Sequence, residues 1–127
     1  NARPHESGVK ATGIDIVSDE KTSSDVHRLL EARYGSRVAL LDFNTVTAIH
    51  EPRASKGNAL ALIAEDLGVD RSQVLAIGDG INDVSMLSWA GHSGTPAHGD
   101  SYAKDSAKEI LKGEGVSGVV ARLLSVL

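Results

Sequence analysis

The segment from Val74 to Leu87 constrains the fold more than any other part of the sequence. It begins with four apolar residues, which predict a short buried strand over 74–77. A loop with the sequence GDGIND (78–83) follows, and an apolar helical pattern begins directly after this loop. A strand, a glycine-rich loop and a helix in this order are typical of an open α/β sheet, in which ligands bind at the carboxyl ends of the strands.

Two carboxylates of this loop, Asp79 and Asp83, lie four positions apart. Carboxylate oxygens suit Mg²⁺, which usually takes one or two of them together with water and substrate phosphate. The loop therefore predicts a Mg²⁺ site next to a phosphorylated ligand. The alternative is an ordinary surface turn, because Gly, Asn and Asp are also common turn residues.

Composition limits the class of protein. The chain has 127 residues, enough for one domain but few for two, and its core must be aliphatic because only 3% of the residues are aromatic. A net charge of −4 without a Lys/Arg cluster argues against a nucleic-acid partner. The lack of Cys excludes disulfides and thiolate metal ligands and favours a cytoplasmic location. No apolar run is long enough for a membrane span.

The pattern changes between residues 52 and 55, where we place a domain boundary. Residues 8–51 predict a strand over 8–17, a helix capped by Ser23 or Ser24, and a hairpin of strands over 38–43 and 45–50. We expect Asp42 to be a residue of this hairpin.

The remaining residues, from 55 onward, alternate helices with strands over 74–77 and 92–95, which predicts a parallel sheet. Ser55 caps the first of these helices, and Asn82 or Asp83 the second. The last two are capped by Ser101 and Ser117, and the third is expected to continue through Ala103, Ala107, Ile110 and Leu111.

Lys56 lies in the first turn of the expected helix after Ser55. The positive end of the helix dipole disfavours a cation there, so a bound anion would explain the lysine. Lys56 would then neutralise a phosphate beside a metal held by Asp79. The alternative is an ordinary solvated lysine.

Several short motifs after residue 53 occur in an order that closely resembles the C-terminal half of the haloacid dehalogenase superfamily, specifically the Cof-type sugar-phosphate phosphatases. The similarity covers roughly residues 53–124 and is carried by SKG (55–57), LGV (67–69), VLA (74–76), GDG (78–80) and ND (82–83). It implies an α/β fold. Residues 53–127 would form the C-terminal half of a Rossmann-like core, a parallel sheet with helices, and residues 1–52 would form part of an α+β cap.

The resemblance also implies roles for four residues. Lys56 matches the lysine that binds phosphate and steadies the nucleophile, and Asn82 matches a residue near the phosphoryl group. Asp79 matches the carboxylate that serves Mg²⁺, while Asp83 matches the acid that supports the metal shell and the lysine. The implied activity is a Mg²⁺-dependent phosphatase of small phosphorylated metabolites, in particular sugar phosphates.

The sequence departs from the family in two places. Residues 97–100 read AHGD where family members often read GNA, and no DxD motif, the family's source of nucleophile and general acid/base, occurs in residues 1–127. The chain also begins with Asn rather than Met. We therefore expect a fragment that is inactive alone, and that forms a homodimer or associates with the missing N-terminal half.

Two alternatives remain open. The chain could be a non-catalytic module that retains the fold and acts through binding or self-association. It could also be part of a P-type ATPase phosphorylation domain, whose GDGxND loop is similar to residues 78–83.

Overall fold

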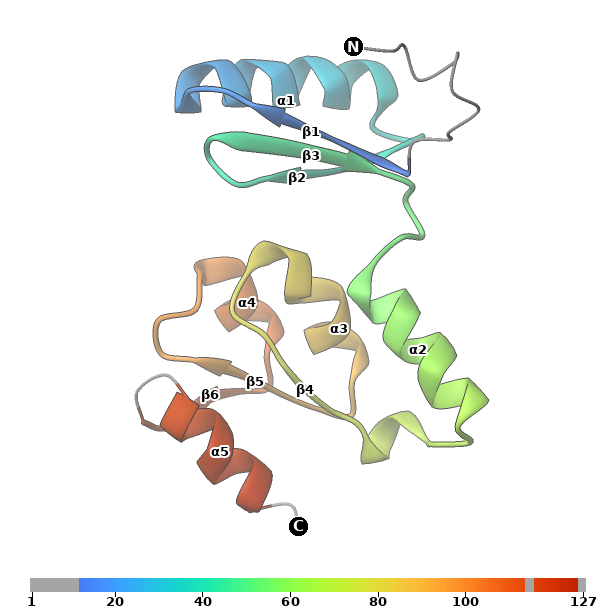
Figure 1. The fold of residues 1–127 in the computed structure, drawn as a ribbon, viewed down its shortest axis with the longest axis vertical. Coiled ribbons are helices and arrows are strands. Elements are labelled where there is room, and N and C mark those ends of the chain that lie inside the picture. The colour runs from blue at the N-terminus through green and yellow to red at the C-terminus, as the bar shows by residue number, and fades with distance from the viewer. Residues whose placement is uncertain (1–11, 114–115, 126–127) are drawn as a thin grey trace. The chain divides into compact units, whose positions relative to one another are not determined.

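The structure is a computed structural model that describes residues 12–113 and 116–125 (Figure 1). The chain divides into two compact units, Asn1–Ala54 and Ser55–Leu127. Within the described residues, no helix has both the length and the apolar character that crossing a bilayer requires.

The first unit is a three-stranded antiparallel sheet with one helix. Its elements are β1 (Gly13–Val17), α1 (Glu20–Tyr34), β2 (Ala39–Asp42) and β3 (Val46–His50), and the strand order is β1-β3-β2. The hairpin of β2 and β3 is confirmed. It turns at Asn44, which adopts a positive φ of 65°, and the Asp42 carboxylate accepts a hydrogen bond from the Asn44 amide at 2.9 Å.

The expected cap of α1 was wrong. Asp19 caps this helix by accepting a hydrogen bond from the Thr22 amide, whereas Ser23 is fully buried and its hydroxyl lies 3.0 Å from the Thr47 hydroxyl on β3. Ser23 therefore links α1 to β3 through a hydrogen bond between buried hydroxyls. The predicted first strand is confirmed over β1, and its residues 8–11 lie outside the described residues.

The second unit is the parallel α/β structure that the sequence predicts. It contains α2 (Lys56–Asp66), the 3₁₀ turn η1 (Arg71–Gln73), β4 (Leu75–Ile77), the 3₁₀ turn η2 (Ile81–Asp83), α3 (Val84–Trp89), β5 (His92–Pro96), α4 (Ser101–Ser106), β6 (Glu109–Leu111) and α5 (Val116–Leu124). The strand order is β4-β5-β6, with both pairs parallel. Figure 1 shows α3 and α4 along the same side of this sheet, with α5 beside β6.

A small aliphatic core holds the second unit together. Its buried members come from β4, α3 and α4, and Leu60, Val74, Met86, Trp89 and Ala107 pack around them. The buried members are Ala76, Leu87, Ala90 and Ala103. Trp89 is thus a partly buried residue at the margin of this core.

The sequence misplaced several boundaries in this unit. Helix α4 ends at Ser106, and Ile110 and Leu111 belong to strand β6. Asp100, not Ser101, caps α4 through a 2.7 Å hydrogen bond from the Ala103 amide. Ser117 lies inside α5 rather than at its cap.

Candidate functional site

The loop after β4 is folded around the side chain of Asp83. One carboxylate oxygen of Asp83, Oδ2, accepts hydrogen bonds from the backbone amides of Asp79 (2.9 Å) and Gly80 (3.1 Å). A side chain at position 78 would overlap the Asp83 side chain, so only glycine allows this approach. Asp83 occupies the N-cap position of α3 but makes no side-chain cap bond there, because its oxygens serve the preceding loop.

Helix α2 brings Lys56 to the other oxygen of the same carboxylate. The Lys56 ammonium group donates to Asp83 Oδ1 at 2.5 Å, across 27 positions of sequence. The helix can come this close because Gly57 packs directly on α3, where its amide donates to the Ser85 hydroxyl at 3.0 Å. Ser55 caps α2, as predicted, by accepting from the Asn58 amide.

Asp83 is ionised in this setting. Burial alone raises the pKa of Asp83, whose residue is only 4% exposed. The hydrogen bond from Lys56 and those from the amides of residues 79 and 80 outweigh that effect and hold the pKa below its ordinary value. Lys56 faces solvent on its other side, since half of its side chain is exposed. The Asp83 carboxylate is thus held in place by hydrogen bonds, while the Lys56 ammonium group remains partly exposed to solvent.

Asp79 differs from Asp83 in being exposed. Within residues 12–113 and 116–125 its carboxylate has no hydrogen-bond partner, so its oxygens are free to bind a cation. Asn82 is half-buried, and its side-chain oxygen lies against Gly80 in the same loop. The four predicted site residues thus come from one loop and the helix that packs beside it.

The described residues contain no group of three or more His, Cys, Asp or Glu side chains arranged to hold a metal. A cation at Asp79 would therefore complete its coordination with water or with a bound phosphate, which is the way Mg²⁺ is commonly held. The predicted metal role of Asp83 stays a prediction, and both of its oxygens already accept hydrogen bonds.

Asp100 supports the site and was not among the predicted residues. Its backbone amide donates to the Asp79 carbonyl oxygen at 2.9 Å, which ties the loop after β5 to the loop after β4. Its carboxylate caps α4 at the same time. The preference of Asp for the N-cap position, directly before an apolar helical pattern, was the signal that could have identified this residue.

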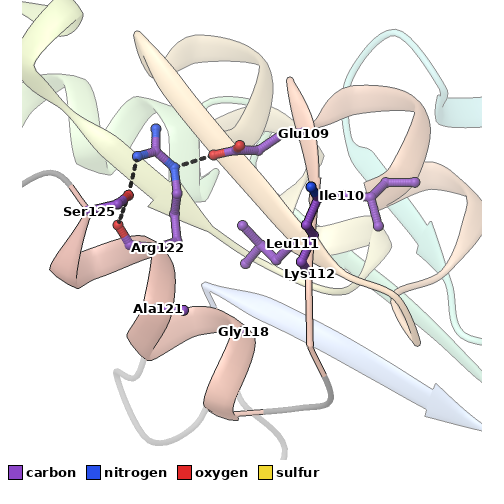
Figure 2. Close-up of a pocket in the computed structure, with 8 residues that line it drawn as sticks. All are labelled: Glu109, Ile110, Leu111, Lys112, Gly118, Ala121, Arg122 and Ser125. Atoms are coloured by element: carbon purple, nitrogen blue, oxygen red, sulfur yellow. Dashed lines mark hydrogen bonds and ion pairs between the residues drawn. The ribbon is translucent and has the colours of Figure 1, made fainter.

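A separate hollow of about 240 Å³ lies between β6 and α5 (Figure 2). The Arg122 guanidinium group donates to the Glu109 carboxylate across this hollow and also to the Ser125 hydroxyl, so it already has hydrogen-bond partners within the chain. None of the four predicted site residues lines this hollow, whose walls are Glu109, Ile110, Leu111, Lys112, Gly118, Ala121, Arg122 and Ser125.

Comparison with known proteins gives a consistent result. Residues 3–123 match the haloacid dehalogenase-like hydrolase family. A phosphoglycolate phosphatase of Methanopyrus kandleri is 33% identical over 121 residues, which cover 94% of this chain and 52% of that protein. Another, of Halobacterium salinarum, is 34% identical over 114 residues, which cover 87% of this chain and 50% of that protein. The chain spans about half the length of these curated relatives.

Solved structures share the fold. A haloacid dehalogenase-like hydrolase from B. subtilis superposes with a TM-score of 0.77 at 23% identity, over 91% of this chain and 41% of that one. One from Bacteroides thetaiotaomicron gives 0.71 at 24% identity, over 91% of this chain and 45% of that one. The predicted α/β architecture is confirmed.

Proposed function

Because this chain belongs to the haloacid dehalogenase-like hydrolases, we propose that it forms part of a Mg²⁺-dependent phosphatase of small phosphorylated metabolites. The observation that carries this proposal is the Lys56–Asp83 pair beside the free carboxylate of Asp79, at the carboxyl end of β4. This is the end of a parallel strand at which α/β proteins bind their ligands.

Each site residue has a role in the proposed chemistry. Lys56 binds a phosphoryl oxygen with its exposed ammonium group, and Asp83 positions Lys56 and fixes the loop. Asp79 would hold the metal, and its exposed carboxylate fits the oxygen ligands that Mg²⁺ prefers. When bound, Mg²⁺ would offset negative charge on the transferring phosphoryl group. Asn82, from the same loop, would contact the phosphoryl group.

Two classes of substrate are candidates for the proposed phosphatase. The resemblance to Cof-type phosphatases suggests sugar phosphates, and the names of the curated relatives suggest phosphoglycolate. Both are small phosphate monoesters, so both would present the same phosphoryl oxygens to Lys56. We propose that the site recognises this shared phosphoryl group. We also propose that the nucleophile comes from a segment outside these 127 residues, since no DxD motif occurs within them.

The proposal is tested by binding, measured by amide NMR on the 127-residue chain. Mg²⁺ should shift the amides of residues 79 and 80 with weak, millimolar affinity, and Asp79→Asn should abolish the shift. Inorganic phosphate added with Mg²⁺ should then shift the amides around Lys56. Lys56→Met should remove this second response, whereas Lys21→Met, on the exposed surface of α1, serves as the matched control.

Two results would contradict the proposed roles. A phosphate response that survives in Lys56→Met would remove the lysine from the site. Micromolar Mg²⁺ affinity would mean that the metal has protein ligands other than Asp79, because a single carboxylate with water does not bind Mg²⁺ so tightly.

A second candidate function is self-association without catalysis. It is favoured by exposed apolar side chains of the second unit, namely Leu62 and Ile63 on α2 and Leu67 at its C-cap, which are 56–69% exposed. In the described residues β4 pairs only with β5, so its other edge is free. Such an edge favours pairing with another chain.

A further inference from the structure

The loop between β5 and α4, residues 97–100, forms a second wall beside Asp79. Strands β4 and β5 are parallel neighbours, with Ile77 paired to Gly94, so the loops that follow them leave the sheet at the same edge. The loop is held by the bond from the Asp100 amide to the Asp79 carbonyl and by a turn in which the Gly99 amide donates to Pro96 O at 2.9 Å. Its position beside Asp79 is therefore fixed by the backbone.

Glycine at position 99 is required for this close approach. A Cβ atom there would overlap the Thr95 hydroxyl and would lie 3.4 Å from the Asp79 carbonyl oxygen. The Thr95 hydroxyl is fully buried beneath this loop and has no hydrogen-bond partner among the described residues. Unpaired buried polar atoms are rare in folded proteins and call for a specific explanation. Gly99 therefore lies directly against both the Thr95 hydroxyl and the Asp79 carbonyl oxygen.

His98 is exposed in this loop, as are Ala97 and Asp100, and it is the one residue of the four whose side chain carries N–H donors. It is adjacent to Gly99, and consecutive Cα atoms are only about 3.8 Å apart, so its backbone lies one residue from the contact with Asp79. Across residues 12–113 and 116–125 its imidazole has no hydrogen-bond partner. An imidazole always carries at least one N–H donor, and its protonated form adds a positive charge, so it suits a phosphate oxygen.

We propose that His98 contacts the phosphate ester bound beside Lys56 and Asp79, by donating an imidazole N–H to a phosphoryl oxygen. The inference rests on the proposed function and adds a phosphate-binding residue to it. The site would then hold the phosphoryl group between two donors, Lys56 from α2 and His98 from the loop after β5.

The chain contains a matched control for this proposal. His92 is also exposed. It is the first residue of β5, so it lies at the end of the strand opposite to the loop that carries His98. Carbon–proton NMR spectra resolve the two imidazoles in one sample. On titration with inorganic phosphate in the presence of Mg²⁺, the His98 signals should shift together with the amides around Lys56, and the His92 signals should not move.

The affinity for phosphate provides the second measurement. His98→Ala should weaken phosphate binding by about fivefold, the size expected for the loss of one ordinary hydrogen bond. His92→Ala should leave it unchanged. Unchanged affinity in His98→Ala, with the Lys56 response intact, overturns the role of His98 and leaves the proposed function standing. If phosphate shifts no residue around Lys56 or Asp79, both proposals fail.

Discussion

Asp83 is the residue on which both the loop and Lys56 depend. Its carboxylate accepts one hydrogen bond from the lysine and two from the backbone, and it is almost completely buried. A buried carboxylate in this position is stable only while all three donors are present. Removing its charge therefore affects the fold and the site together.

We predict that Asp83→Asn lowers the free energy of unfolding of the second unit by on the order of 2 kcal/mol at neutral pH, since it replaces a charged acceptor of several hydrogen bonds. Asp79→Asn should have little effect, because the exposed Asp79 carboxylate bonds to no described residue. Urea denaturation of both variants and the wild type measures the difference. Equal stability of all three proteins would contradict the structural role of Asp83.

The same comparison has a predicted pH dependence. The folded pKa of Asp83 is lowered, so its contribution is complete above the unfolded pKa of about 3.9 and disappears as pH falls through the folded value. The gap between wild type and Asp83→Asn should therefore close in acid. Asp19 and Asp70 also have lowered pKa values, caused mainly by hydrogen bonds from the Thr22 and Ser72 hydroxyls. These remain in the variant, so the difference isolates Asp83.

Single residues were predictable where chemistry is local. Lys56, Asp79 and Asp83 were identified from the residue types and spacing, and the structure joins Lys56 to Asp83. Asp100 was missed as a site residue because its link to the loop after β4 is a backbone amide, whereas its side chain signals only the cap of α4. The cap of α1 was missed because several polar residues precede that helix, and only the packed structure shows that Ser23 is buried.

At the scale of elements, the site depends on the close contact between α2 and α3. Gly57 lies so near Ser85 that an added Cβ would come within 2.5 Å of the Ser85 carbonyl oxygen. That oxygen belongs to the backbone and cannot rotate away. The two helices must move apart to accommodate any side chain at this position.

We therefore predict that Gly57→Ala destabilises the second unit by about 1–3 kcal/mol, as overpacking usually does. The variant should also weaken the response of the Lys56 amide region to phosphate, because the lysine moves with its helix. Gly13→Ala is the control, since a Cβ there would make only ordinary contacts. Thermal unfolding of both variants gives the comparison, and a Gly57→Ala protein as stable as the wild type would refute the packing argument.

The type of most elements could be predicted, but β6 could not. The spacing of Ala103, Ala107, Ile110 and Leu111 fits a helix, yet the last two form a strand that pairs with β5. Leu111 is buried against Gly94, a contact between residues seventeen positions apart. Tertiary packing of this kind overrides local periodicity. A short apolar segment does not show by itself whether it will form a helix or pair as a strand.

At the scale of the whole molecule, the proposed phosphatase chemistry needs a nucleophile in addition to Lys56, Asp79 and Asp83. We predict that it does not hydrolyse p-nitrophenyl phosphate with Mg²⁺, because residues 1–127 contain no DxD motif to form a phosphoenzyme. A spectrophotometric assay tests this directly. Steady turnover that is abolished by Asp79→Ala would contradict the prediction and show that another residue of this chain is the nucleophile.

Self-association is the prediction that depends on the second unit as a whole. Among the described residues, the second edge of β4 has no partner strand. Ile63 on α2 and Leu67 at its C-cap, one helical turn apart, are both exposed. Unpaired strand edges and exposed apolar side chains both favour contact between chains. We expect a dimer at tens of micromolar, with two-fold symmetry as the commonest arrangement for identical chains.

Light scattering and sedimentation measure this equilibrium. Changing both Ile63 and Leu67 to Glu should shift it toward monomer, whereas Leu29→Glu should not, although Leu29 of α1 is equally exposed. Amide exchange provides an independent test. Since β4 already pairs with β5 on one side, the amides of residues 74–77 should all be protected only at concentrations where the dimer forms. A well-folded monomer in which these amides are fully protected would refute the prediction, since it would show that β4 already has its second partner within the chain.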